Sequence, residues 1–186
     1  MCGHKVFNLT FNMQLNISSS RDRNRAMDEW LKEEIAAAKK RKELKERKLS
    51  RRELDAQVIT TGMNKFWSAL LTALRSSIEQ FNKAGVSDEP ITMDVKESRV
   101  WIRTPGYPSV QLFLEFRDGM NDVEIHLGRE DTISSTMTNL LNGTLDFDVS
   151  DDGHLMLRDN GSLMNVSQTA EYLMRKVLPV IYSGRY

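Results

Sequence analysis

The chain has 186 residues, with 26 basic and 26 acidic side chains and 40% apolar residues, which suits one domain with a buried core rather than a multidomain enzyme. No apolar run reaches the ~18 residues of a membrane span, and the first residues lack the apolar region of a secretory signal. A single cysteine excludes an internal disulfide and favours a reducing compartment. We therefore expect a cytoplasmic protein, or a nuclear one if the source is eukaryotic.

Residues 6–17 alternate between apolar side chains, beginning with Phe7, Leu9 and Phe11, and uncharged polar ones. This period of two predicts a strand with one buried face, which would pair with the main sheet or with another copy of itself. A disordered leader is the alternative. The three serines at 18–20 predict a break, so residues 1–20 form the first segment of the expected organisation.

Residues 21–62 are rich in Ala, Leu, Glu, Lys and Arg and contain no proline, which predicts a long, largely solvated helix. The triplet Thr60-Thr61-Gly62 predicts a kink or break at the end of this basic helical arm, because β-branched residues and glycine are poor helix formers.

After the triplet, apolar residues recur at intervals of three and four, which predicts a core-facing helix that ends near Gly85. The same spacing could form a helix–helix dimer seam. These positions are Met63, Phe66, Trp67, Leu70, Leu71, Leu74, Ile78 and Phe81.

Six strand-like runs follow, at residues 91–96, 99–104, 110–117, 122–127, 144–149 and 154–159. Their short connections require antiparallel pairing. Between the fourth and fifth runs, a cap at Asp131 or Thr132 and an apolar face predict a short helix that ends at Gly143. A last helix is expected to start at a Ser167 cap and to end or bend at Pro179.

These elements predict an α+β fold: an antiparallel sheet of about six strands packed by helices on one face, preceded by a long charged N-terminal helix. The compact domain is expected to span residues 63–186 and to stay folded when residues 1–60 are deleted. The order of helices and strands is similar to that of small dimeric secretion chaperones.

Each candidate motif for catalysis or metal binding is either incomplete or has a simpler structural explanation. Residues 148–159 match part of an EF-hand calcium loop, but alternating strands flank Asp152-Gly153, which indicates a hairpin turn. His126 shares a strand face with Glu124, as an acid–base pair would, although an exposed polar face gives the same pattern. The sequence predicts no catalytic residues, no metal site and no cofactor, which favours a protein that is not an enzyme.

The most concentrated chemical feature is a run of cationic residues within a chain of zero net charge. Residues 39–55 carry nine basic and four acidic side chains. Such a run binds phosphates, although the interleaved Glu43 and Glu46 and the absence of aromatic residues also fit a solvated helix or one that docks on acid. The anion-binding candidates are Lys39, Lys40, Arg41, Lys42, Lys45, Arg47, Lys48, Arg51 and Arg52.

Trp101 and Phe113 fall on the strand positions opposite the predicted core, and Tyr107 lies in the turn between them. An uncovered sheet face would present all three as a partner surface. In the alternative, the N-terminal strand or the long helix covers them.

The leading hypothesis is a non-catalytic protein-interaction module that binds a protein partner or, as a homodimer, its own copy, with a basic helical arm. The alternative is binding of nucleic acid or another anionic surface through residues 39–52.

Overall fold

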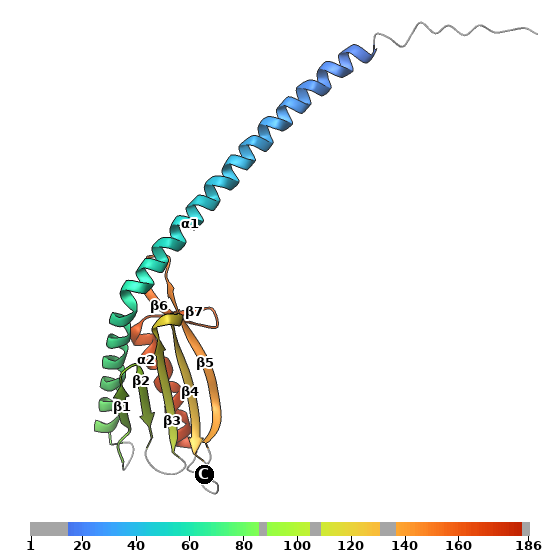
Figure 1. Cartoon of the computed structure of the whole chain (residues 1–186). Helices are drawn as coiled ribbons and strands as arrows, with labels where there is room; N and C mark the ends of the chain where they lie inside the picture. Colours follow the sequence, from blue (N-terminus) through green and yellow to red (C-terminus); the bar gives the residue numbers. More distant parts are fainter. Residues whose placement is uncertain (1–14, 86–88, 105–108, 131–136, 184–186) are drawn as a thin grey trace, which may run out of the picture. The chain divides into compact units, whose positions relative to one another are not determined.

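The computed structural model describes residues 15–85, 89–104, 109–130 and 137–183, and the side chains of 27–85, 89–104, 109–130 and 138–178. The chain divides into two compact units, Met1–Arg52 and Glu53–Tyr186. The elements are α1 (Leu15–Lys83), β1 (Thr92–Lys96), β2 (Arg99–Arg103), β3 (Val110–Arg117), the 3₁₀ turn η1 (Asp118–Met120), β4 (Asp122–Glu130), β5 (Met137–Val149), β6 (Leu155–Asp159), β7 (Ser162–Met164) and α2 (Val166–Ser183) (Figure 1). The predicted α+β class is confirmed.

The sheet is an antiparallel meander in which the strands lie side by side in chain order, from β1 to β7. It has seven strands where the sequence predicts about six, because β6 turns back into the three-residue β7. Asn160 and Gly161 occupy that turn with φ of 46° and 87°. Two successive positive φ values are the geometry of a type I′ hairpin, which the Asn-Gly pair adopts readily.

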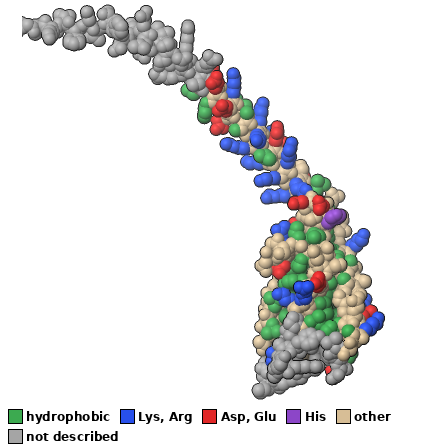
Figure 2. Space-filling view, turned by 180° about the vertical axis from the view of Figure 1, so that it is seen from behind, with side chains coloured by type: hydrophobic (Ala, Val, Ile, Leu, Met, Phe, Trp, Pro, Cys, Tyr) green, Lys and Arg blue, Asp and Glu red, His purple; other side chains and the backbone are tan. Residues whose placement is uncertain are grey.

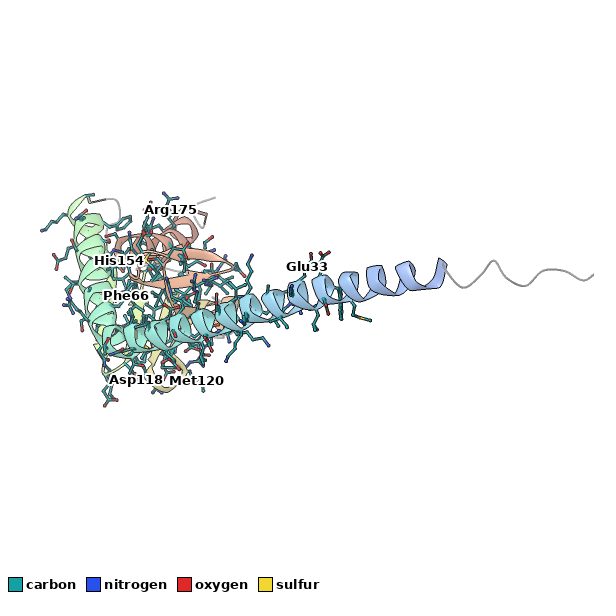
Figure 3. All side chains as sticks on the ribbon, turned by 90° about the horizontal axis from the view of Figure 1, so that it is seen from above. Glu33, Phe66, Asp118, Met120, His154 and Arg175 are labelled. Atoms are coloured by element: carbon teal, nitrogen blue, oxygen red, sulfur yellow. The ribbon has the colours of Figure 1, made fainter. Side chains whose placement is uncertain are left out.

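The core lies between one face of the sheet and the helices α1 and α2. In α1, the predicted apolar stripe is confirmed: Leu70 and Leu74 are fully buried, and Phe66 packs edge-on against Phe147 with ring centroids 5.5 Å apart. Phe66 lies among the packed side chains, whereas Arg175 of α2 lies at the periphery (Figure 3). The strands contribute every second residue to this core, including Val100, Ile102, Val110, Leu112, Leu114, Val123, Ile125, Leu145 and Leu157.

The predicted break at Thr60-Thr61-Gly62 is wrong, because α1 continues through it. The hydroxyl groups of Thr60 and Thr61 donate to the carbonyl oxygens of Ala56 and Gln57, one turn earlier, and so fit within the helix. The glycine permits close packing instead: a Cβ at Gly62 would lie 2.8 Å from a methyl carbon of Leu155 in β6.

The start of α1 also differs from expectation. The predicted strand over residues 6–17 lies outside the described residues up to position 14, and its last three residues lie in α1. The helix also includes the serines at 18–20, where a break is predicted. Extending a formed helix adds one hydrogen bond per residue fixed, so three serines do not suffice to end it.

The other end of α1 is fixed to the sheet. Gly85 adopts φ of 63°, the left-handed conformation that ends many helices, as its position predicts. One turn before it, the Asn82 side chain donates to the carbonyl oxygen of Ile91 and accepts from the Ile91 amide, each at 2.9 Å. This pair of hydrogen bonds holds the helix against the residue that precedes β1.

The short helix predicted up to Gly143 is wrong where the structure describes it. Residues 137–143 are the first half of β5, and residues 131–136 lie outside the described part. The physical reason is long-range pairing: β4 continues to Glu130, and Met137 to Leu141 pair with it in antiparallel register. The similarity of element order to the secretion chaperones depends on that helix and is lost with it.

The cap of helix α2 lies two residues earlier than predicted, and the helix begins at Val166. Asn165 and Gln168, rather than Ser167, form the cap: each side-chain oxygen accepts from the backbone amide of the other residue at 3.0 Å. The helix also continues past Pro179 to Ser183, which corrects the predicted end there.

Tyr172 connects α2 to the end of β6. Its hydroxyl group donates to Oδ2 of Asp159 at 2.7 Å. Burial, together with this hydrogen bond to a carboxylate, raises the pKa of Tyr172 from its ordinary value to about 12.

This contact predicts a pH dependence of stability. The folded chain keeps the Tyr172 proton up to pH about 12, whereas the unfolded chain releases it near pH 10. The contribution of Tyr172 to stability is therefore complete below pH 10 and is lost as the pH rises to 12. We expect the free energy of unfolding, measured by urea titration across this window, to fall more steeply for the wild type than for Tyr172→Phe. Equal slopes would contradict the contact.

Candidate interaction surface

The face of the sheet opposite the core carries one row of rings across three strands. The register places Trp101 of β2, Phe113 of β3 and His126 of β4 directly opposite one another. The ring centroids are 5.4 Å apart for Trp101 and Phe113 and 5.7 Å apart for Phe113 and His126. We call these three residues the ring row. Each is half-buried, and within the described part of the chain neither helix contributes a side chain to it.

A chain of polar contacts begins where the ring row ends. Nδ1 of His126 lies 2.9 Å from Oδ1 of Asn142 on β5, and Nε2 lies 2.8 Å from Oε1 of Glu124. The other Glu124 oxygen accepts from Arg117, which also binds both Asp122 oxygens, all at 2.7 Å. The hydrogen bond to Asp122 raises the pKa of Arg117 above its ordinary value.

His126 and Glu124, which the sequence places on one strand face, are hydrogen-bonded, and the geometry is that of a structural network rather than of an acid–base pair. Both ring nitrogens and both Glu124 oxygens already have partners. A catalytic acid–base pair needs one group directed at a substrate proton, and neither residue has such a group.

Most charges on this face are paired. Arg99 contacts Glu115 at 2.8 Å, and Arg158 contacts Asp148. Arg103 is exposed and has no ion-pair partner among the residues that the structure describes. It lies beside Trp101, on the side of the ring row opposite to Glu115 and Glu124.

The predicted partner residues are thus partly brought together. Trp101 and Phe113 touch, while Tyr107 lies outside the described residues. Sequence reasoning missed that His126 extends the row. The short connections between β2, β3 and β4 and the alternation along each strand contain that information, because together they set the cross-strand register.

The nine anion-binding candidates lie in α1, within the unit Met1–Arg52, and all are exposed. At 100° per residue, positions 39–52 distribute their cations around the whole helix. Figure 2 shows Lys and Arg side chains on both sides of this part of α1. Lys42 lies 3.9 Å from Glu46, an exposed pair that contributes little, and Arg51 also has a partner. Residues 39–52 therefore present a high density of positive charge to the solvent.

An apolar stripe precedes the basic run and was missed by sequence reasoning. Met27, Trp30, Leu31 and Ile35 recur at helical spacing and are each between 49% and 63% exposed. The signal was present in the spacing of four between Met27, Leu31 and Ile35.

The acidic stretch at 148–159 is a hairpin rather than a calcium loop. Gly153 donates its amide to the carbonyl oxygen of Ser150 at 2.9 Å, and Val149 of β5 pairs with Leu155 of β6. In the described ranges, no group of three or more His, Cys, Asp or Glu residues could hold a metal ion. Neither described helix has an apolar stretch long enough to cross a membrane.

In comparisons with known proteins, no protein family, curated protein sequence or solved structure matches this chain.

The Arg117 contacts predict a measurable loss of stability. Asp122 is only 8% exposed, so removing its partner leaves a carboxylate in a site that water reaches poorly. We expect Arg117→Leu to lower the urea midpoint of unfolding with an unchanged m-value. Arg99→Leu, which removes the more exposed pair with Glu115, is the matched control and should lower it less. Adding Asp122→Leu to Arg117→Leu should recover most of the loss; equal effects of the two single variants would refute the role of Asp122.

Proposed function

We propose that this protein is a non-catalytic interaction module that associates with a second copy of itself through the sheet face that bears the ring row. The observation that carries the proposal is the row itself, three contacting rings on a face to which neither described helix contributes. Aromatic side chains at the centre of a surface are the groups that contribute most to binding between proteins.

The distribution of charge supports a second copy as the partner. Arg103 lies on one side of the ring row, and Glu115 and Glu124 lie on the other. A two-fold axis along the row brings the Arg103 side of each copy onto the carboxylate side of the other. The remaining arginines on this face are already paired, so the contact leaves few charges without a partner.

Reversal of the Arg103 charge tests this proposal. We expect sedimentation equilibrium of the full chain to show a monomer–dimer equilibrium, and Arg103→Glu to raise the dissociation constant about tenfold, or about 1.4 kcal/mol. Lys65→Glu, at an exposed position of α1, makes the same change of charge away from the sheet and should have no effect. A wild-type protein that stays monomeric, or equal effects of the two variants, would refute self-association through this face.

A second candidate function is binding of a polyanion, such as nucleic acid, by residues 39–52 of α1. The observation that favours it is the set of nine exposed cations on all sides of one helix. Neutralising phosphates with such groups releases counterions, which makes the affinity fall steeply with salt. A groove of a duplex offers phosphates on several sides of a helix, as this distribution requires.

Replacement of four cations by glutamine tests this second function. Lys39, Lys40, Arg41 and Lys42 are changed together, because glutamine preserves helix propensity and removes only charge. We expect fluorescence anisotropy with labelled duplex and single-stranded DNA to show binding at about 50 mM salt that is lost at about 200 mM, and lost in the variant.

The matched control removes the same number of charges from exposed positions of the unit Glu53–Tyr186: Lys65, Arg75, Lys83 and Lys96. This control should bind like the wild type. Absence of binding by the wild type at low salt would overturn the function, as would equal losses in the two quadruple variants.

A further inference from the structure

The strand β5 lies between β4 and β6 in the sheet and is much longer than β6. It pairs with β4 from Met137 to Asp146, whereas only its last four residues, Asp146 to Val149, pair with β6. Therefore, along the edge of β5 that faces away from β4, no described strand lies beside residues 138–145. Leu140, Asn142, Gly143 and Thr144 are exposed. An open strand of this kind presents unpaired backbone N–H and C=O groups that another strand can satisfy.

A cavity of about 340 Å³ lies next to this open edge, between β5, the end of β6 and α2. Ile125, Leu141 and Leu145 form its apolar part, and Asp159, Tyr172 and Lys176 form its polar part. Its size is at the lower end of the range of about 300–1,000 Å³ in which ligand sites fall. We call the cavity and the open edge together the edge groove.

Gly143 creates the space in this cavity. It is the cross-strand partner of the buried Ile125, at a position where a side chain would point toward the core side. A Cβ placed on Gly143 would meet no atom within 4 Å, and the backbone there does not need the left-handed conformation. The glycine is therefore required neither by a turn nor by close packing, and its missing side chain leaves room that a ligand can fill.

The polar wall of the cavity contains one cation, Lys176, and one anion, Asp159, which form no ion pair with each other in the described structure. The two Asp159 oxygens accept from Tyr172 at 2.7 Å and from Asn160 at 2.9 Å. Lys176 lies over the Tyr172 ring, with Nζ 5.0 Å from the centroid, and has no carboxylate partner in the described part of the chain. A ligand that carries a carboxylate would supply that partner.

We propose that the edge groove binds an extended peptide segment of a partner protein. The peptide adds as a strand to residues 138–145 of β5, places an apolar side chain over Gly143, and directs a carboxylate, from its own C-terminus or from an acidic side chain, toward Lys176. Backbone pairing supplies affinity in such strand addition, and the pocket supplies specificity. This site goes beyond self-association through the ring row, since it uses the edge of the sheet rather than its outer face.

A displayed library of random octapeptides tests the proposal, with the full-length protein as bait. We expect selected peptides to be rich in β-branched residues and to contain an acidic group. Gly143→Phe fills the cavity and should weaken their binding at least tenfold. Gly119→Phe is the matched control, because that glycine also has open space around it and no positive φ, and it should bind normally.

Charge reversal separates recognition from folding. Lys176→Glu should weaken binding at least tenfold, whereas Arg175→Glu, at the exposed neighbouring position of α2, should not. Hydrogen exchange at the amides of residues 138–145 should slow when a selected peptide is bound. The proposal is overturned if the library yields no peptide that prefers the wild type to Gly143→Phe, or if selected peptides leave these amides unprotected. Arg103→Glu should bind the peptides normally, so failure of self-association and failure of this site are distinguishable.

Discussion

Burial of one face of the seven-stranded sheet under α1 and α2 is the constraint on which the rest of this structure depends. Each strand offers alternate side chains to the two faces, so the positions that fill the core also determine which residues stay outside. Leu112 and Leu114 face the helices, and Phe113 between them must face away. The covered face explains the stability of the unit, and the opposite face carries the ring row through which we propose self-association.

Contacts between its own side chains stabilise the outer face of the sheet, although neither described helix packs on it. Its rings contact one another, and its arginines other than Arg103 are held by carboxylates on neighbouring strands, as Arg117 is by Asp122 and Glu124. Paired charges cost less to bring into a protein contact than isolated ones, which suits association with a surface of the same composition. The ordered Glu124–His126 contact serves this network, since each of its polar atoms already has a partner.

The face and the edge of the sheet offer two different kinds of recognition. In the proposed self-association, the ring row contributes side chains, and such a surface selects a partner by shape and charge. The open part of β5 offers backbone groups, which accept any extended chain, so selectivity there must come from the cavity at Gly143 and from Lys176. Because the ring row lies on β2, β3 and β4 and the open edge lies on β5, the two proposed contacts do not compete, and one module could hold a second copy and a peptide together.

The sequence by itself determined the fold class, the core stripe of α1 and most strands, because period-two and helical spacings report burial directly. It also placed Trp101 and Phe113 on the outer face. Only the tertiary structure decided the features that depend on contacts between residues distant in the chain. Pairing with β4 makes residues 137–143 a strand, although their local sequence pattern predicts a helix. Leu155 packs onto Gly62, where the local sequence predicts a break in α1. The edge groove belongs to this second group, since it exists only because β6 is too short to cover β5, and strand lengths are settled by pairing rather than by local sequence.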